Sequence, residues 1–321
     1  MSAARVVEVR GLHVHHSGVR AGTVRAVDGV DLAIDAGETL GLVGESGCGK
    51  STLARALLRL LQPTAGTITF QGRDITNMRA RELRPLRRHM QMVFQDPYAS
   101  LNPRMRVLDI IGEALDIHGL AADHVARRAR VLQLVRKVGL GDDSLSQFPH
   151  ELSGGMRQRV GIARALAVEP SFLVCDEPVS ALDASVRAQV VNLLADLRDE
   201  LGLTMLFIAH DLAVVRHLTT RVAVMYLGRI VEEAATQELF ARPLHPYTKA
   251  LLAAAPVPDP TQRRAGGALA GEPGSPLHIP PGCRFHPRCP EAIDRCRTED
   301  PALVAIGATR VACHVVAARS P

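Results

Sequence analysis

The chain contains no uninterrupted apolar run of about 18 residues, the length that a membrane-spanning helix needs. Its first residues, MSAARVVEVRGL, also lack the apolar core of a signal peptide. With 47% hydrophobic and 22% charged residues, the composition is that of a soluble globular protein. We therefore expect a cytoplasmic protein that reaches any membrane through partner chains.

Lysine and aromatic residues are scarce. Lysine occurs only at Lys50, Lys137 and Lys249, so the net charge of +5 comes almost entirely from arginine. The densest basic run, Arg79 to His89, has no aromatic residue on which a nucleic-acid base would stack. A solvated basic face therefore explains the charge better than nucleic-acid binding does.

A phosphate-binding loop is indicated by GESGCGKST, which fits the G-x-x-x-x-G-K-[ST] pattern. It follows an apolar strand, Thr39 to Val43, and opens a helix, Ser51 to Leu61. Backbone N–H groups at the helix N-terminus and the charge of Lys50 would bind phosphates, and Ser51 would bind Mg²⁺. The residues of this phosphate loop are Gly44, Glu45, Ser46, Gly47, Cys48, Gly49, Lys50, Ser51 and Thr52.

Two further motifs lie downstream. One is LSGGMRQRV, which begins at Leu152, and the other is SFLVCDEP, an apolar strand that ends on Asp176 and Glu177. With the phosphate loop, these segments resemble the motifs of ABC ATPases. The resemblance implies an α/β P-loop NTPase with an N-terminal antiparallel β subdomain, an inserted helical subdomain and a small cysteine-containing C-terminal extension.

The catalytic candidates follow from strand ends and from the resemblance. Asp176 ends its strand where Mg²⁺ sits, and Glu177 is placed to polarise the attacking water. Gln95, in VFQDPYASLNP, matches the family's glutamine that approaches Mg²⁺ and water, within a segment that contacts the transmembrane partner. His210 matches the histidine that contacts the γ-phosphate of ATP.

A nucleotide site shared between two ATPase modules is implied by the same resemblance. Ser153, Gly154 and Gly155 begin a helix and would contact the ATP held by the opposite module, with Asp183 at the dimer seam. The family's aromatic residue that stacks on adenine is missing, and His16 stands in its place after LHVH. An imidazole stacks over a smaller area than tyrosine or tryptophan.

The order of elements along the chain predicts its domains. Alternating apolar residues predict an N-terminal β layer, and strands separated by a helix after residue 170 predict a parallel sheet. A hairpin is expected at RVAVMYLGRIVEE, turning at Leu227 and Gly228. We predict an ATPase domain at 1–255, with its helical subdomain at about 97–160, a Pro/Gly-rich linker at 256–282 and a four-cysteine extension at 283–321.

The cysteines of the extension are Cys283, Cys289, Cys296 and Cys313. Cytoplasmic thiols are normally reduced, which favours a metal or a redox role over disulfides. Four thiolates suit tetrahedral zinc or an iron–sulfur cluster, and the spacing leaves the metal open. His286 and His314 are neighbouring donors that could compete with the cysteines.

The segments LHPYTKALLAAAPVPDP and GCRFHPRCP resemble the C-terminal extension of oligopeptide/dipeptide (Opp/Dpp) importer ATPases. The resemblance implies a [4Fe-4S] cluster on the four cysteines, with Zn²⁺, or free thiols on a packed loop, as the alternatives. It also implies an ATP-hydrolysing subunit of a peptide importer at the cytoplasmic side of the inner membrane. Its expected partners are a second ATPase subunit, here a paralogue, two permease subunits and, indirectly, an extracytoplasmic solute-binding protein.

Three alternatives stay open at this stage. Related importers for nickel or other small solutes share parts of the same extension. A soluble ABC ATPase acting on nucleic acid would suit the basic charge, but no second module or long coiled-coil insertion is present, and we expect no nucleic-acid partner. A metal sensor with a vestigial ATPase is disfavoured because Lys50, Gln95, Glu177 and His210 are all in place.

Overall fold

The computed structural model describes residues 4–18, 22–254 and 274–319. The chain divides into two compact units. The first unit is built mainly from Asn77–Ala209, and the second from Ala4–Ile34, Glu38–Thr76 and the chain from His210 on. The predicted linker at 256–282 lies largely outside the described residues, which resume at residue 274.

The first unit contains three parallel strands, in the order β8, β7, β6. All residues of β7 and β8 are buried, as expected for strands that are covered on both faces. Their bounds are β6 Met90–Val93, β7 Phe172–Asp176 and β8 Thr204–Ile208, and the helices are α2 Ala80–Arg87, α3 Pro97–Ser100, α4 Val107–His118, α5 His124–Lys137, α6 Gly154–Leu166 and α7 Ala184–Leu201, with 3-10 turns η1 Asp142–Ser146 and η2 Pro149–Glu151.

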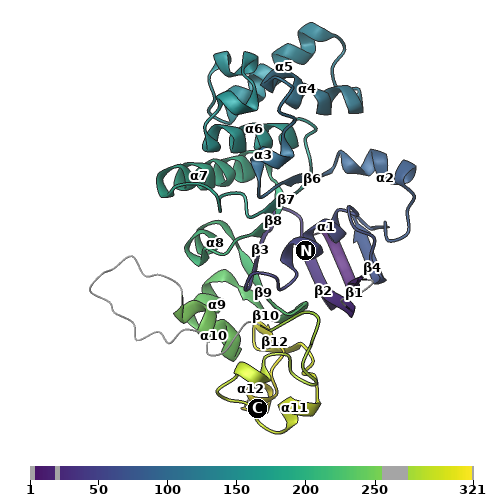
Figure 1. The fold of residues 1–321 in the computed structure, drawn as a ribbon, viewed down its shortest axis with the longest axis vertical. Helices are drawn as coiled ribbons and strands as arrows, with labels where there is room; N and C mark the ends of the chain where they lie inside the picture. Colours follow the sequence, from purple (N-terminus) through teal and green to yellow (C-terminus); the bar gives the residue numbers. More distant parts are fainter. Residues whose placement is uncertain (1–3, 19–21, 255–273, 320–321) are drawn as a thin grey trace. The chain divides into compact units, whose positions relative to one another are not determined.

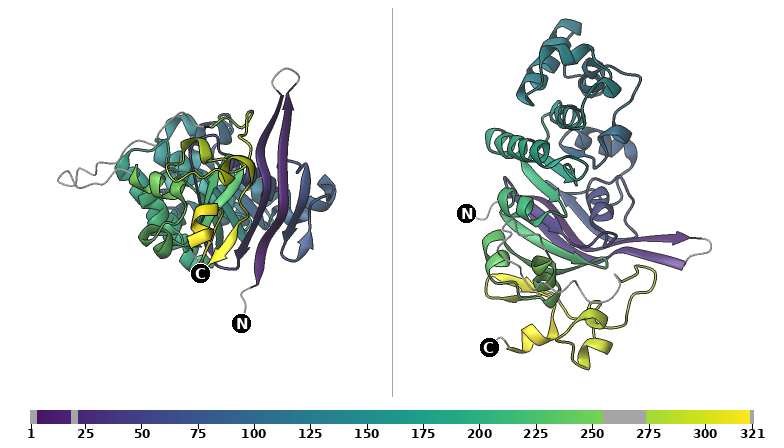
Figure 2. Two further views of the ribbon diagram at one scale, coloured as in Figure 1. Left: turned by 90° about the horizontal axis from the view of Figure 1, so that it is seen from below. Right: turned by 60° about the vertical axis from the view of Figure 1, so that its left-hand side comes forward.

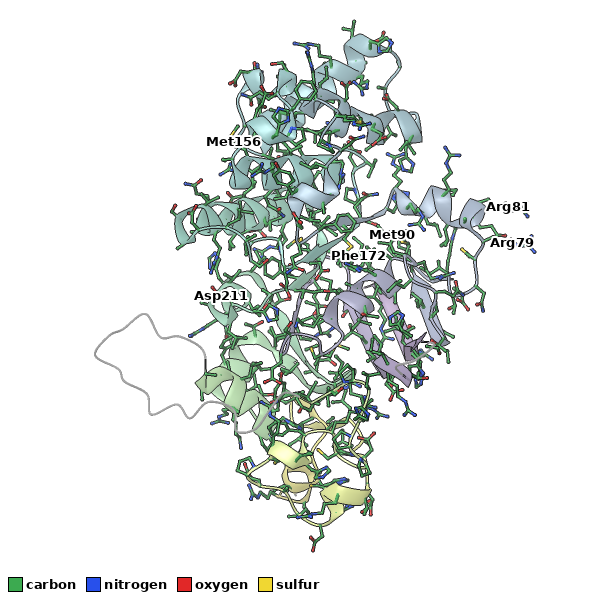
Figure 3. The ribbon with its side chains drawn as sticks, viewed as in Figure 1. Arg79, Arg81, Met90, Met156, Phe172 and Asp211 are labelled. Carbon is green, nitrogen blue, oxygen red and sulfur yellow. The ribbon has the colours of Figure 1, made fainter. Side chains whose placement is uncertain are left out.

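Helices α4 and α5 lie side by side and form the predicted helical insertion (Figure 1). Arg127 of α5 joins them through Asp116 of α4, with Nε 3.0 Å from a carboxylate oxygen, and its guanidinium fills the space over Gly112. The basic run begins on α2, where Arg79 and Arg81 are exposed and point away from the ribbon (Figure 3). This position agrees with the predicted solvated basic face.

The second unit contains two sets of strands. One is a sheet in the order β2, β1, β4, β5, in which β1 and β2 are two long strands (Figure 2). The other is β3, β9, β10, β12, β11, with β3 and β9 parallel and the remaining pairs antiparallel. The bounds are β1 Arg5–Gly18, β2 Gly22–Asp35, β3 Thr39–Val43, β4 Ala65–Phe70, β5 Arg73–Asp74, β9 Arg221–Tyr226, β10 Arg229–Ala235, β11 Val304–Ile306 and β12 Thr309–Val311.

The helices of the second unit are mostly short. They are α1 Lys50–Leu57, α8 Leu212–Leu218, α9 Thr236–Ala241, α10 Pro246–Ala253, α11 Arg295–Thr298 and α12 His314–Arg319, with the 3-10 turn η3 His286–Arg288. Among the described helices of both units, none is long and apolar enough to cross a membrane.

The predicted hairpin is confirmed, and its turn has a clear physical cause. Leu227 and Gly228 both have positive φ, at 42° and 82°. Two adjacent left-handed residues make the turn that matches the twist of antiparallel strands, and glycine adopts that conformation at no steric cost.

The C-terminal extension adds two strands, β11 and β12, to the second unit. Strand β12 pairs with β10, with Val311 opposite Glu232, and β11 pairs with β12. At the end of the predicted linker, the Pro276 carbonyl accepts a hydrogen bond from Arg25 N at 3.3 Å. The extension therefore adds to the core, whereas the boundaries at 255 and 282 stay predictions.

A buried imidazole joins α10 to this unit. His245 is 1% exposed, and its Nδ1 accepts a hydrogen bond from Tyr247 N at 3.0 Å, which caps α10. The backbone N–H groups of Leu244 and His245 donate to the carboxylate of Glu232 at 2.7 and 3.0 Å. Burial lowers the pKa of His245 to about 3, so its side chain stays neutral in the folded protein.

We predict that this histidine weakens the fold at acidic pH. Between pH 6.5 and about 3 the unfolded chain binds a proton at His245 and the folded chain does not, so the free energy of unfolding falls as pH falls. The slope approaches about 1.4 kcal/mol per pH unit. Denaturant titrations followed by tyrosine absorbance at several pH values measure it.

His245→Asn is the matched variant, because asparagine keeps an N-cap acceptor and does not titrate. Subtracting its profile removes the contributions of Glu232 and the other carboxylates. The prediction is wrong if wild type and variant lose stability in parallel from pH 7 to pH 4.

Candidate active site

The phosphate loop connects β3 to α1, and its glycines are required by close approaches. Gly44 and Gly49 have φ of 155° and 111°. A Cβ on Gly44 would lie 2.2 Å from Met225 O, and one on Gly49 would lie 2.0 Å from Ala26 O. No larger residue fits at either position, so the loop backbone presses directly on β2 and β9.

Lys50 is buried within this loop. Its side chain donates hydrogen bonds to the carbonyl oxygens of Gly44 and Glu45, at 2.8 and 2.9 Å, and lies 3.8 Å from the sulfur of Cys48. Burial raises the pKa of the Cys48 thiol and keeps it protonated. The ammonium is therefore held inside the loop by backbone carbonyls, and its contact with nucleotide phosphates stays a prediction, whereas the buried Cys48 has a packing role.

Two residues outside the motif hold Glu45 from two sides. The backbone N–H of Glu45 donates to Tyr247 Oη at 2.8 Å. Its carboxylate accepts two hydrogen bonds from Arg288, at 2.7 and 3.0 Å. Sequence reasoning missed both partners, because nothing in the spacing of PYTKALL or FHPRCP links them to Glu45, which lies 202 residues before Tyr247 and 243 before Arg288.

A buried aromatic cluster supports these contacts. It consists of Tyr226, Tyr247 and Phe285, whose ring centroids are 4.6 Å apart for the two tyrosines and 5.3 and 5.4 Å from Phe285. Each ring is 2% exposed or less. Since Phe285 lies in the extension, the cluster attaches the extension to the elements that contact the phosphate loop.

In the first unit, Asp176 ends the buried strand β7 and Glu177 follows it, as predicted. Glu177 has a positive φ of 48°, a conformation that costs on the order of 1 to 3 kcal/mol for a residue with a side chain. Its backbone N–H donates to Ile208 O at 3.0 Å, and its carboxylate accepts a hydrogen bond from Gln95 Nε2 at 2.8 Å. The structure thus brings together two of the three predicted catalytic side chains.

The predicted signature residues also lie in the first unit. Ser153 caps α6 by accepting from Met156 N at 3.3 Å, and Asp183 caps α7 by accepting from Val186 N at 3.0 Å. A Cβ on Gly155 would lie 2.3 Å from Val186, so the glycine lets α6 approach α7 closely. Ser153 and Asp183 are exposed and accessible to another molecule.

The two predicted histidines are both exposed. His16 lies on β1, and His210 follows Ala209, between β8 and α8. Their roles in adenine and γ-phosphate binding stay predictions.

Beside His16, two histidines share one carboxylate. His13 Nδ1 and His15 Nε2 lie 2.9 and 2.8 Å from the same oxygen of Asp28, a compact group of metal-ligand type. The other Asp28 oxygen binds Arg284 of the extension. Burial opposes ionisation of Asp28, but the bonds from Arg284 and His15 outweigh it and lower the pKa. We therefore interpret the group as a hydrogen-bonded ion pair that holds the extension.

The four cysteines of the extension are free thiols and at least partly buried. Burial, together with the charges of the other three cysteines, raises the pKa of Cys283 to about 11. His286 and His314 each place one ring nitrogen 2.9 Å from a backbone carbonyl, that of Cys283 and of Glu299. These bonds orient the two imidazoles toward the backbone, and metal binding by the four thiols stays a prediction.

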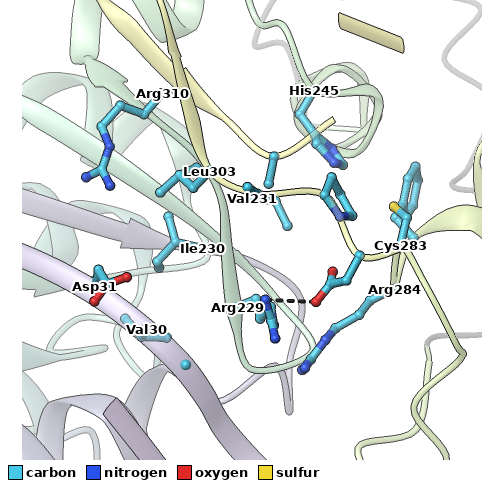
Figure 4. A pocket seen from close by; sticks show the side chains of 16 residues that line it. Val30, Asp31, Arg229, Ile230, Val231, His245, Cys283, Arg284, Leu303 and Arg310 are labelled. Atoms are coloured by element: carbon cyan, nitrogen blue, oxygen red, sulfur yellow. Dashed lines mark ion pairs between the residues drawn. The ribbon is translucent and has the colours of Figure 1, made fainter. Parts of the chain in front are cut away.

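A cavity of about 310 Å³ lies between the extension and strands β2 and β10 (Figure 4). Arg229, Arg284 and Arg310 line it, and Arg229 pairs with Asp300 at 2.8 Å. Cys283 lines the cavity. The structure describes every residue of the phosphate loop, and none of them lines this cavity. The cavity therefore belongs to the extension and is separate from the predicted ATP site.

Two family profiles match this chain. The ABC transporter profile matches residues 27–180, which include the phosphate loop, Gln95, the signature and Glu177. The profile of the oligopeptide/dipeptide transporter C-terminal region matches residues 231–296, from β10 to the third cysteine of the extension. The second match begins in β10, the strand that pairs with β12 of the extension.

Similar proteins cover nearly the whole chain. The probable peptide ABC transporter ATP-binding protein y4tS of Sinorhizobium fredii is 57% identical over 91% of this chain and 83% of its own length. The putative oligopeptide transport ATP-binding protein YkfD of Bacillus subtilis is 53% identical over 97% and 95%. The oligopeptide transport ATP-binding protein OppF of Salmonella typhimurium is 52% identical over 88% and 85%.

The fold agrees with solved structures. A dimeric post-hydrolysis structure of the ATP-binding cassette MJ0796 with ADP and phosphate has a TM-score of 0.66 and 29% identity, covering 72% of this chain and 98% of that one. The predicted P-loop ABC ATPase fold is thereby confirmed. The chain belongs to the ABC transporter ATP-binding proteins that carry the oligopeptide/dipeptide transporter C-terminal region, and it is an ATPase that couples ATP hydrolysis to transport.

Proposed function

We propose that this ATPase drives the import of peptides, docked on the cytoplasmic side of two permease subunits in the inner membrane. The observation that carries the proposal is the matched C-terminal region at 231–296, which contributes Tyr247, Phe285 and Arg288 to contacts around the phosphate loop. The names of the relatives, which refer to peptide or oligopeptide transport, support the same cargo.

The catalytic assignment rests on oxygen donors and on one hydrogen bond. Ser51, Gln95 and Asp176 offer the hard oxygen ligands that Mg²⁺ prefers, and Asp176 is 2% exposed at the end of its strand. Bound Mg²⁺ would neutralise charge on the phosphates. Gln95 holds the Glu177 carboxylate at 2.8 Å, which fixes the side chain that polarises the attacking water.

Two ATPase modules are proposed to share two ATP molecules. The exposed Ser153 and the N-terminus of α6 offer hydrogen-bond donors to phosphate, and Asp183 is exposed in the same unit. The related cassette of known structure is a dimer. We expect the second module to be a paralogous subunit, with a solute-binding protein outside the membrane delivering the peptide.

An iron–sulfur cluster is proposed for the extension. Four thiols are the soft donors that a [4Fe-4S] cluster takes. A single zinc ion with Zn–S bonds of about 2.3 Å needs its sulfurs about 4 Å apart. Among the described residues, His13, His15 and Asp28 form a group whose possible ligand atoms all lie within 4.8 Å of one another. This group includes no cysteine. The cluster, with zinc as the alternative, is proposed from the four free thiols and from the resemblance of the extension.

Glu177→Gln is predicted to remove hydrolysis and keep ATP binding. The amide has the size of the carboxylate that Gln95 contacts, but it cannot act as a base toward water. We therefore expect the turnover number for ATP hydrolysis to fall by about 10²-fold or more. Phosphate release and equilibrium ATP binding measure the two effects. Glu200→Gln, at an exposed acid that pairs with Lys137, is the control. Full hydrolysis by Glu177→Gln would overturn the assignment.

Peptide transport is tested with the protein's own permeases. Co-expression with candidate permease subunits from the same genome should yield a complex whose ATPase rate rises several-fold when peptide and its binding protein are added. Stimulation by Ni²⁺ or another small solute, and none by peptide, would refute the peptide cargo. Salt-sensitive binding to DNA or RNA without permease association would refute the transport role itself.

The metal content of the extension is the third test. Protein purified without oxygen is expected to be brown and to contain about four irons and four sulfides per chain. Serine at any one of the four cysteines should lower the iron content. Cys175→Ser is the control, since that thiol is fully buried in β7. Colourless protein with one zinc per chain would reject the cluster.

A further inference from the structure

Glu45 places a negative charge inside the loop that binds the phosphates of ATP. Its side chain is only 20% exposed, so water screens the charge poorly. Lys50, the loop's only cation, binds the backbone carbonyl of Glu45 and not its carboxylate. An unneutralised carboxylate at this position would oppose the triphosphate.

Arg288 neutralises this carboxylate. Its side chain is 6% exposed, and its two terminal nitrogens bind the two Glu45 oxygens at 2.7 and 3.0 Å, the forked geometry that favours arginine over lysine. Tyr226 also bonds to the guanidinium, and an arginine side chain keeps its charge at physiological pH. The arginine is therefore fixed and permanently charged.

Neighbouring contacts hold Arg288 in position beside the phosphate loop. Phe285, three residues before Arg288, is buried against Tyr226 and Tyr247. Tyr247 Oη accepts the hydrogen bond from Glu45 N, so the backbone and the side chain of Glu45 are held by the same assembly. The ion pair is thus built into the fold and differs from an exposed surface pair, which contributes little.

We propose that Arg288 is a positioning residue of the ATP site, which sets ATP affinity by cancelling the charge of Glu45 and orienting the phosphate loop. The C-terminal extension then supplies part of the nucleotide site of its own chain. The proposal rests on the assignment of Gly44–Thr52 as the phosphate site. It goes beyond the proposed cargo, because it holds whatever solute is transported.

A double-mutant cycle, in which glutamine replaces each charged side chain, tests the proposal on the full-length chain. The net charge of the Glu45–Arg288 pair is zero in wild type, −1 in Arg288→Gln, +1 in Glu45→Gln and zero in the double variant. We expect the Kd for ATP to rise about tenfold in Arg288→Gln and to return to within about twofold of wild type in the double variant. Glu45→Gln should bind ATP at least as tightly as wild type.

The readouts separate charge from folding. The loss in Arg288→Gln should be smaller for ADP than for ATP, because fewer phosphates weaken the repulsion. Thermal melting without nucleotide monitors the fold. Arg295→Gln is the matched control, since Arg295 pairs with Glu299 in an exposed ion pair of the same extension.

Two outcomes overturn the role of Arg288. One is unchanged ATP affinity in Arg288→Gln, and the other is a double variant that binds no better than Arg288→Gln, which would indicate damage to the fold. Lys50→Ala tests the underlying assignment and should abolish binding. If it binds ATP like wild type, the phosphate-loop assignment fails; if it loses binding while Arg288→Gln does not, only the role of Arg288 fails.

Discussion

The packing of Tyr226, Tyr247 and Phe285 is the contact on which the second unit depends. The chain has three tyrosines, seven phenylalanines and no tryptophan, and three of these rings meet at this one point. They come from β9, from α10 and from the extension. Each buried ring contributes roughly 1.5 to 3 kcal/mol, so the cluster can hold a segment that has little regular structure of its own.

The packing of these three rings also brings arginines of the extension to acidic side chains of the core. Once Phe285 is seated, the extension brings arginines to acids of the core that are buried or nearly so. These pairs are Arg284 with Asp28, Arg288 with Glu45 and Arg310 with Glu233. A buried carboxylate that loses its partner destabilises the fold by several kcal/mol. Part of the positive charge that could suggest nucleic acid is thus used within the molecule, and the extension acts as a component of the ATPase core.

Local patterns predicted local structure well, and long-range pairs poorly. The apolar runs at Thr39–Val43 and Phe172–Asp176, and the turn at Leu227 and Gly228, were predicted because each depends on residues adjacent in sequence. Strands β11 and β12 have three residues each, too few to show a period. The pairing of Glu45 with Arg288 joins residues 243 positions apart and leaves no trace in spacing. The positive φ of Glu177 likewise reflects tertiary constraint, which propensity does not report.

The position of the cysteines gives the extension a physical link to the ATP site. Cys283 and Cys289 flank the short segment that holds Arg284, Phe285 and Arg288, and Arg288 is covalently joined to Cys289. Cys283 N also bonds to Cys296 O at 2.9 Å, which closes this segment against the next cysteine. The group proposed for the thiols would restrict both ends of the segment, and each residue already ordered spares about 1 to 2 kcal/mol of backbone entropy when its side chain docks. Ligation of the cysteines would therefore favour the same conformation that presents Arg288 to Glu45.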